Sequence, residues 1–185
     1  MTHRYVALLR GINVGGHRVE MRRLRALFEE LGFRDVSTFI ASGNVVFSTD
    51  SDDAEGLRTS IEGHLERELG YAVATFLRTP AELALTADAG KGDARDGEPG
   101  ASHYVIFLHD PAQDSLRSEL RALESDVDAF RCAGREIHWT MRGKLSESPL
   151  FGGAIERATR RVPTTMRNMT TLRRLAAKVG ATREG

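Results

Sequence analysis

The stretch YVALL at residues 5–9, followed by RGINVGG at residues 10–16, decides the fold that the sequence predicts. Its first part is almost fully apolar, which is typical of a strand buried on both faces. Apolar residues then recur at helical spacing over residues 21–31. Gly32 follows, and glycine readily adopts the left-handed conformation that ends helices. A buried strand, a glycine-rich loop and a helix therefore open the chain.

The next segments complete a six-element pattern. Residues 36–40 and 45–47 are predicted as two strands, because they are rich in residues that favour sheets. The spacing Asp52-x-x-Glu55 resembles a capping box that opens a second helix, and residues 73–77 form a fourth strand. The order β-α-β-β-α-β is that of a ferredoxin-like unit.

The second part of the chain repeats this order. The stretch YVIFL at residues 104–108 corresponds to residues 5–9, and a helix is expected from Asp110 onward. The remaining predicted elements are a hairpin of strands 129–132 and 136–141, a helix around 150–155, a short strand at 164–166 and a final helix over 171–179.

The predicted fold is therefore α+β, with two tandem ferredoxin-like halves, antiparallel sheets and a C-terminal helix. The first domain is assigned to residues 1–88, including a short helix that starts with the capping pattern Thr79-Pro80-Ala81-Glu82. Residues 89–102 are rich in Gly, Asp and Glu without an apolar period, and they are predicted to be an exposed linker. The second domain is assigned to residues 103–185.

Composition limits the possible functions. The formal net charge is zero, but residues 142–185 hold ten basic and three acidic residues. This asymmetry indicates either a basic face for an anionic partner or ends that neutralise an acidic middle. The single cysteine, Cys132, allows no intrachain disulfide. Without a signal peptide or an apolar run of about 20 residues, the protein is expected in the cytoplasm with no membrane partner.

The glycine-rich loop at residues 11–16 is the first candidate binding feature. A turn of this kind between strand and helix can direct several backbone N–H groups at one anion. It matches the first six positions of a P-loop, but His17 and Arg18 stand where Lys and Ser or Thr belong, so a nucleoside triphosphatase is excluded. The alternative is a loop that needs glycine only for its backbone angles.

A second feature, the turn at residues 42–44, is predicted to lie beside this loop. In a β-α-β-β-α-β sheet the first two strands run in the same direction, so the loop and the turn share one sheet edge. No other constellation points to chemistry, because the six histidines show no paired ligand spacing. No metal, no cofactor and no catalytic group is therefore predicted.

Three motifs resemble a known family. They are ALLRGINVGG at residues 7–16, SGNVVF at residues 42–47 and TMRNMTT at residues 165–171. Together they are similar to the domain-of-unknown-function 1697 family, over about residues 4–180. The third motif departs from the family pattern T-R-N-W-N-T, since Met169 stands in place of Trp. The resemblance implies paired ferredoxin-like units of mostly bacterial origin and supplies no reaction.

Three function classes remain open. The first is binding of a phosphate-bearing ligand, either a nucleotide or RNA, at the glycine-rich loop. The second is an enzyme acting on a small polar or anionic substrate, and the third is an interaction or scaffold protein whose loop serves only folding. The sequence leaves the oligomeric state open. The candidate ligand-binding residues are Arg10, Gly11, Asn13, Gly15, Gly16, Ser42, Gly43, Asn44, Arg167 and Asn168.

Overall fold

The computed structural model describes residues 1–13, 16–41, 43–93 and 95–181. It confirms an α+β protein with two four-stranded antiparallel sheets. The chain divides into two compact units. Unit 1 comprises Met1–Leu83 and the end of the chain from Val179, and unit 2 comprises Ala84–Lys178.

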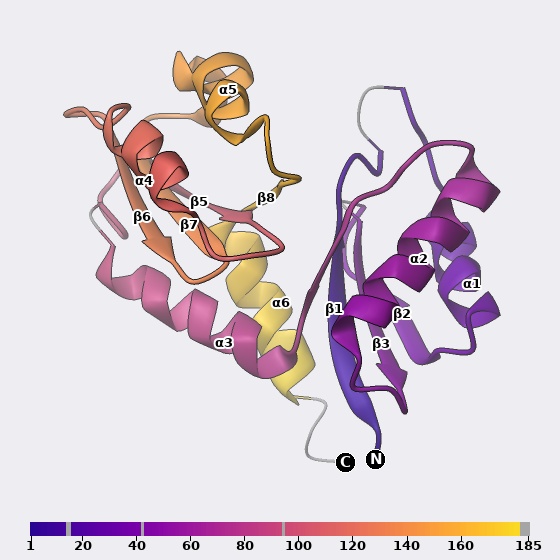
Figure 1. Ribbon diagram of the computed structural model, residues 1–185. Helices are drawn as coiled ribbons and strands as arrows, with labels where there is room; N and C mark the ends of the chain where they lie inside the picture. Colours follow the sequence, from indigo (N-terminus) through magenta and orange to yellow (C-terminus); the bar gives the residue numbers. More distant parts are fainter. Residues whose placement is uncertain (14–15, 42, 94, 182–185) are drawn as a thin grey trace. The chain divides into compact units, whose positions relative to one another are not determined.

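Unit 1 contains one sheet and two helices. Its elements are β1 (His3–Leu9), α1 (Met21–Glu30), β2 (Arg34–Thr38), β3 (Asn44–Thr49), α2 (Ala54–Leu69) and β4 (Thr75–Arg78). The strands lie in the order β2-β3-β1-β4, and neighbouring strands are antiparallel. Both helices lie on the same side of the sheet (Figure 1).

The core of unit 1 lies between this sheet and its two helices. Tyr5, Ala7 and Leu9 point from β1 into this core, because alternate residues of a strand share one face. On the other face of β1, Val6 and Leu8 are also fully buried. Two buried faces explain the unbroken apolar run in the sequence.

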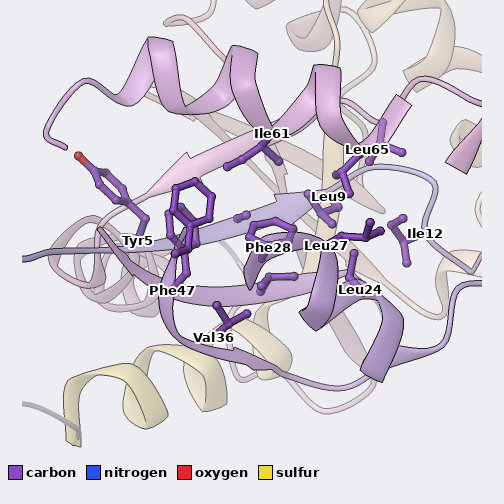
Figure 2. Close-up of a cluster of buried hydrophobic side chains, with 14 of the residues drawn as sticks. Tyr5, Leu9, Ile12, Leu24, Leu27, Phe28, Val36, Phe47, Ile61 and Leu65 are labelled. Atoms are coloured by element: carbon purple, nitrogen blue, oxygen red, sulfur yellow. The ribbon is translucent and has the colours of Figure 1, made fainter. Parts of the chain in front are cut away.

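The helices supply the other half of this core. Leu24, Leu27 and Phe28 form the apolar face of α1 and have no exposed surface. Figure 2 shows Phe28 next to Phe47 of β3, and the two ring centroids lie 5.6 Å apart. The helical spacing recognised in the sequence is therefore the spacing of a buried face.

The N-terminal caps of α2 and of the helix that starts after Thr79 can be compared with the predicted capping residues. α2 is capped by Asp53, whose carboxylate accepts a hydrogen bond from the backbone N–H of Gly56 at 3.0 Å. The prediction of Asp52 as the cap is wrong by one residue, because two adjacent aspartates offer the same cap chemistry. The box at Thr79 and Glu82 is confirmed, since each backbone N–H donates to the other side chain at 2.8 and 3.2 Å.

Unit 2 repeats the sheet. Helix α3 (Pro80–Ala89) precedes it, and the division between the units falls inside this helix. The further elements are β5 (Ala101–Phe107), α4 (Asp114–Arg121), β6 (Asp128–Ala133), β7 (Glu136–Arg142), α5 (Ile155–Thr159), β8 (Thr165–Asn168) and α6 (Met169–Ala181). The strand order is β6-β7-β5-β8, again antiparallel throughout.

The two faces of this second sheet differ. Ile106, Ile137 and Trp139 pack with α4 and α5 in one apolar cluster. The opposite face carries His103 and His138, both nearly fully buried. Burial of two imidazoles requires polar partners on that face.

α4 begins later than the sequence predicts. Its first residue is Asp114, not a residue next to Asp110. The backbone N–H groups of Leu108 and Ala112 donate to carbonyl groups of the β6–β7 turn, at 2.9 and 3.4 Å. These bonds hold the intervening segment out of a helix, a tertiary effect that local sequence does not contain.

The segment predicted as a linker, residues 89–102, has several parts. A single turn at Gly90–Gly92 follows α3, and β5 begins at Ala101. Residues 97–100 are exposed, whereas the side chain of Asp93 is only 4% exposed. The assignment of domains to 1–88 and 103–185 stays a prediction.

Within the described ranges, no helix combines the length and the apolar character needed to cross a membrane.

Candidate functional site

The end of β1 positions the first candidate residue, Arg10. The backbone N–H of Leu9 donates to the carbonyl of Gly43 at 2.8 Å, and that of Arg10 donates to Ala74 at 2.9 Å. The strand end is thus held on both sides. The Arg10 side chain is exposed, and no described residue forms a hydrogen bond or ion pair with it.

The glycine-rich loop is anchored by an apolar side chain. Ile12 is 2% exposed and lies beside Leu9 and Leu24 in the core of unit 1 (Figure 2). Gly11 and Gly16 have φ angles of 76° and 92°, which favour glycine. Burial of Ile12 therefore anchors the loop to the core of unit 1, and the two glycines allow the backbone to turn on either side of it.

Asn13 joins the loop to the neighbouring turn. Its side-chain Nδ2 donates to the carbonyl of Ala41 at 3.1 Å, and its Oδ1 accepts from the backbone N–H of Val19 at 2.8 Å. The loop and the β2–β3 turn therefore meet at one edge of the sheet, as the topology predicts. The nitrogen and the oxygen of this side-chain amide thus both form hydrogen bonds with backbone groups.

Asn44 and Gly43 also have evident structural roles. Asn44 is fully buried, and its Nδ2 donates to the carbonyl of Phe39 at 3.1 Å. Gly43 has a φ of 70°, and a Cβ on it would lie 3.0 Å from Cβ of Ile12. Glycine is required at this position both for its backbone angle and for the close approach. The predicted residues Gly15 and Ser42 lie outside the described residues.

The last two predicted residues lie on β8 in unit 2. Arg167 is 8% exposed, and its Nη1 donates to Thr165 Oγ1 at 2.8 Å and to the carbonyl of Met166 at 2.9 Å. Burial lowers the pKa of Arg167 to about 10. Asn168 Oδ1 accepts from the backbone N–H of Thr170 at 2.8 Å, at the start of α6.

A cluster that the sequence did not indicate lies in unit 2. One ligand atom each of Asp93, His103 and His138 lies within 4.8 Å of the others. These are the described residues that together could hold a metal ion. The two histidines are 35 positions apart in the sequence, so no short spacing links them. The strand register brings them together, because His103 faces Thr140 across β5 and β7 and therefore lies diagonal to His138, and the sequence does not reveal this register.

Comparison with known proteins places the chain among relatives without an assigned function. A family model described as a protein of unknown function (DUF1697) matches residues 1–138. Among solved structures, the chain is similar to the conserved bacterial protein SP0830 from Streptococcus pneumoniae, with 21% sequence identity and a TM-score of 0.72. That similarity covers 97% of this chain and 99% of that one, and at this identity it shows a shared fold alone. No curated protein matches the sequence.

Proposed function

Because the chain belongs to the domain-of-unknown-function 1697 family, whose function is unknown, we propose a function from its own geometry: binding of a phosphate-bearing ligand at the glycine-rich loop of unit 1. The observation that carries the proposal is the exposed guanidinium of Arg10, which forms no hydrogen bond or ion pair with a described residue. It stands at the end of a strand whose backbone is held by hydrogen bonds on both sides. A guanidinium offers paired N–H donors that match two oxygens of a phosphate.

The geometry divides the predicted site into two groups. Asn13, Gly43 and Asn44 position the backbone, since their amides and their close contacts serve neighbouring residues. Arg10 and the backbone N–H groups of the loop are then the groups that contact the anion. The positive φ angles of Gly11 and Gly16 support this role, because left-handed residues in a loop can aim neighbouring N–H groups at one anion.

We also infer that each unit is a ferredoxin-like half. Both units have the order strand–helix–strand–strand–helix–strand, and both sheets have the first strand at the centre beside the third and the fourth. RNA-recognition modules share this order of elements, so RNA is a second source of the same phosphate chemistry. The experiment therefore includes both sources.

Thermal unfolding of wild type and Arg10→Ala, with and without phosphate, nucleotides and sugar phosphates, tests the proposal. A ligand present at 100 times its Kd stabilises the folded state by about 2.7 kcal/mol. We expect such a shift for wild type and its loss in Arg10→Ala, with little change in the unliganded melting temperature. Arg22→Ala is the matched control, because Arg22 is also exposed and unit 1 contains it too.

Two results would contradict or redirect the proposal. If no anion stabilises wild type and Arg10→Ala alone lowers the melting temperature, Arg10 is a structural residue. If RNA is retarded in a gel at about 50 mM salt and released as salt rises, while mononucleotides have no effect, the ligand is RNA. A shift that persists in Arg10→Ala would place the anion elsewhere.

A further inference from the structure

Three ionisable side chains converge on the buried face of the second sheet. His103 stands on β5, His138 on β7, and Asp93 directly after the turn at Gly90–Gly92. Their side chains are 6%, 1% and 4% exposed. Ionisable groups at this depth need partners that compensate the loss of water.

Their facing atoms form a compact triangle. His138 Nδ1 lies 2.9 Å from Asp93 Oδ2, His103 Nε2 lies 3.3 Å from the same oxygen, and the two nitrogens are 3.1 Å apart. In a tetrahedral site with metal–nitrogen bonds of about 2.0–2.1 Å, neighbouring ligand atoms lie about 3.3 Å apart. We propose that Asp93, His103 and His138 bind a divalent transition-metal ion, with one coordination position left open.

The hydrogen positions decide whether the cluster can hold a cation. His103 Nδ1 lies 3.2 Å from Asp96 Oδ1, and a carboxylate only accepts, so this nitrogen carries the hydrogen and Nε2 is left to face the triangle. In one tautomer, His138 Nδ1 carries a hydrogen and donates to Asp93 Oδ2 or to His103 Nε2. In the other tautomer, Nδ1 presents a lone pair, and a metal ion satisfies it together with His103 Nε2 and the carboxylate of Asp93. The rival of the metal is therefore the hydrogen-bonded Nδ1–H tautomer of His138.

The electrostatic environment also keeps one ligand in the form that binds metals. Burial is the main cause that lowers the pKa of His138 below its ordinary value, which favours the neutral imidazole. Metal-binding imidazoles must be neutral, because a proton and a metal ion compete for the same lone pair.

Residues outside the triangle resemble the supports of a metal site. Asp96 accepts from His103 on the ring nitrogen opposite the triangle, which fixes the tautomer and the orientation of the ring. Arg173 of α6 in turn lies 2.9 Å from Asp96 Oδ2. This chain from arginine to carboxylate to imidazole positions His103 without occupying its metal-facing nitrogen.

One residue, Arg131, competes with a metal ion for the carboxylate of Asp93. Arg131 of β6 pairs with Asp93 through Nε and through Nη2, the latter at 3.0 Å from Oδ2. Its side chain is 41% exposed, so it has solvent to move into. Asp93, Arg131 and His138 also line a hollow of about 300 Å³ beside the cluster. The arginine therefore competes with the cation for the same carboxylate.

The ligand set selects the class of metal. Two imidazole nitrogens and one carboxylate oxygen suit Zn²⁺, Co²⁺ or Fe²⁺, whereas Mg²⁺ and Ca²⁺ prefer oxygen ligands throughout. Three protein ligands also leave room for water or an anion at the metal.

Titration of the full chain, stripped with a chelator, with Co²⁺ and then Zn²⁺ tests the proposal. We expect visible absorption from one tetrahedral Co²⁺ per chain, displaced by Zn²⁺. Asp93→Asn and His138→Gln should abolish this absorption, and Asp96→Ala should weaken binding about 10–100-fold. Arg131→Gln should bind more tightly than wild type, because the competing cation is gone.

His64→Gln is the matched control. His64 Nε2 lies 3.0 Å from Glu30 Oε2, a pair of one histidine with one carboxylate in unit 1, and its loss should leave Co²⁺ binding unchanged. The proposal is overturned if wild type binds neither metal at micromolar concentration, or if Asp93→Asn and His138→Gln bind as wild type does. Circular dichroism verifies folding, and Arg131→Gln gives a decisive gain of affinity even if the ligand variants unfold.

Discussion

The polar side chains of the glycine-rich loop in unit 1 and those of the histidine cluster in unit 2 differ in burial and in hydrogen-bond partners. In the loop and the neighbouring turn, the amides of Asn13 and Asn44 form hydrogen bonds with backbone carbonyls, and the side chain of Arg10 is exposed with no partner among the described residues. In the cluster, the ionisable side chains of His103 and His138 are buried and face a shared carboxylate.

This difference shows that a sequence motif and a buried cluster of ionisable side chains need not coincide. The residues of the loop stand out in the sequence because they are adjacent, and much of that pattern maintains the backbone. The cluster has no sequence motif, and its members come from separate segments. Stability measurements on variants of the loop and the turn therefore show which of their residues have a structural role.

The largest effect is expected for Gly43→Ala in the β2–β3 turn. The new methyl group would lie 3.0 Å from Cβ of Ile12 and 3.2 Å from Cβ of Leu9, at a φ of 70°. Left-handed strain and overpacking together should lower the free energy of unfolding by about 3 kcal/mol. Gly16→Ala is the control, since nothing lies within 4 Å and only strain of about 1–2 kcal/mol applies. Urea unfolding measures both, and equal losses would contradict the structural role of Gly43.

A smaller effect is expected for Asn44→Ala. Asn44 is fully buried, so the variant leaves the carbonyl of Phe39 without this donor, at a cost of about 2–3 kcal/mol. Asn13→Ala should cost about 1 kcal/mol, because its contact with Ala41 is exposed and water can replace the amide. Thermal unfolding of the two variants gives the comparison. If Asn44→Ala unfolds at the wild-type temperature, the buried amide is held for another purpose.

The mildest perturbation is limited proteolysis, which is expected to cut the chain first in the predicted linker. Residues 97–100 are exposed, and Gly97 and Gly100 have φ angles of 81° and 77°. Brief proteolysis should cut there first, because the segment lies outside both sheets. Mass spectrometry of the fragments locates the cut. A first cut within residues 4–48 would contradict the predicted division of the chain.

The sequence anticipated most elements and missed some of their ends. Strands β1, β5 and β7 and helix α1 lie where the apolar patterns predict, because burial of one face imposes a period on the residues. β2 was expected at 36–40 but ends at Thr38, and Ile40 has a φ of 51°. The chain turns earlier because the backbone of Phe39 pairs with Asn44 across the turn.

Local sequence by itself determined the order of elements, the apolar faces and the adjacency of loop and turn, because each depends on periodicity or on the direction of strands. Only the tertiary structure decided which polar side chains form hydrogen bonds with the backbone and which are exposed. It alone brought Asp93, His103 and His138 within hydrogen-bond distance of one another. The register of β5 against β7 sets that meeting, and register results from packing of a whole sheet, which no short stretch of residues encodes.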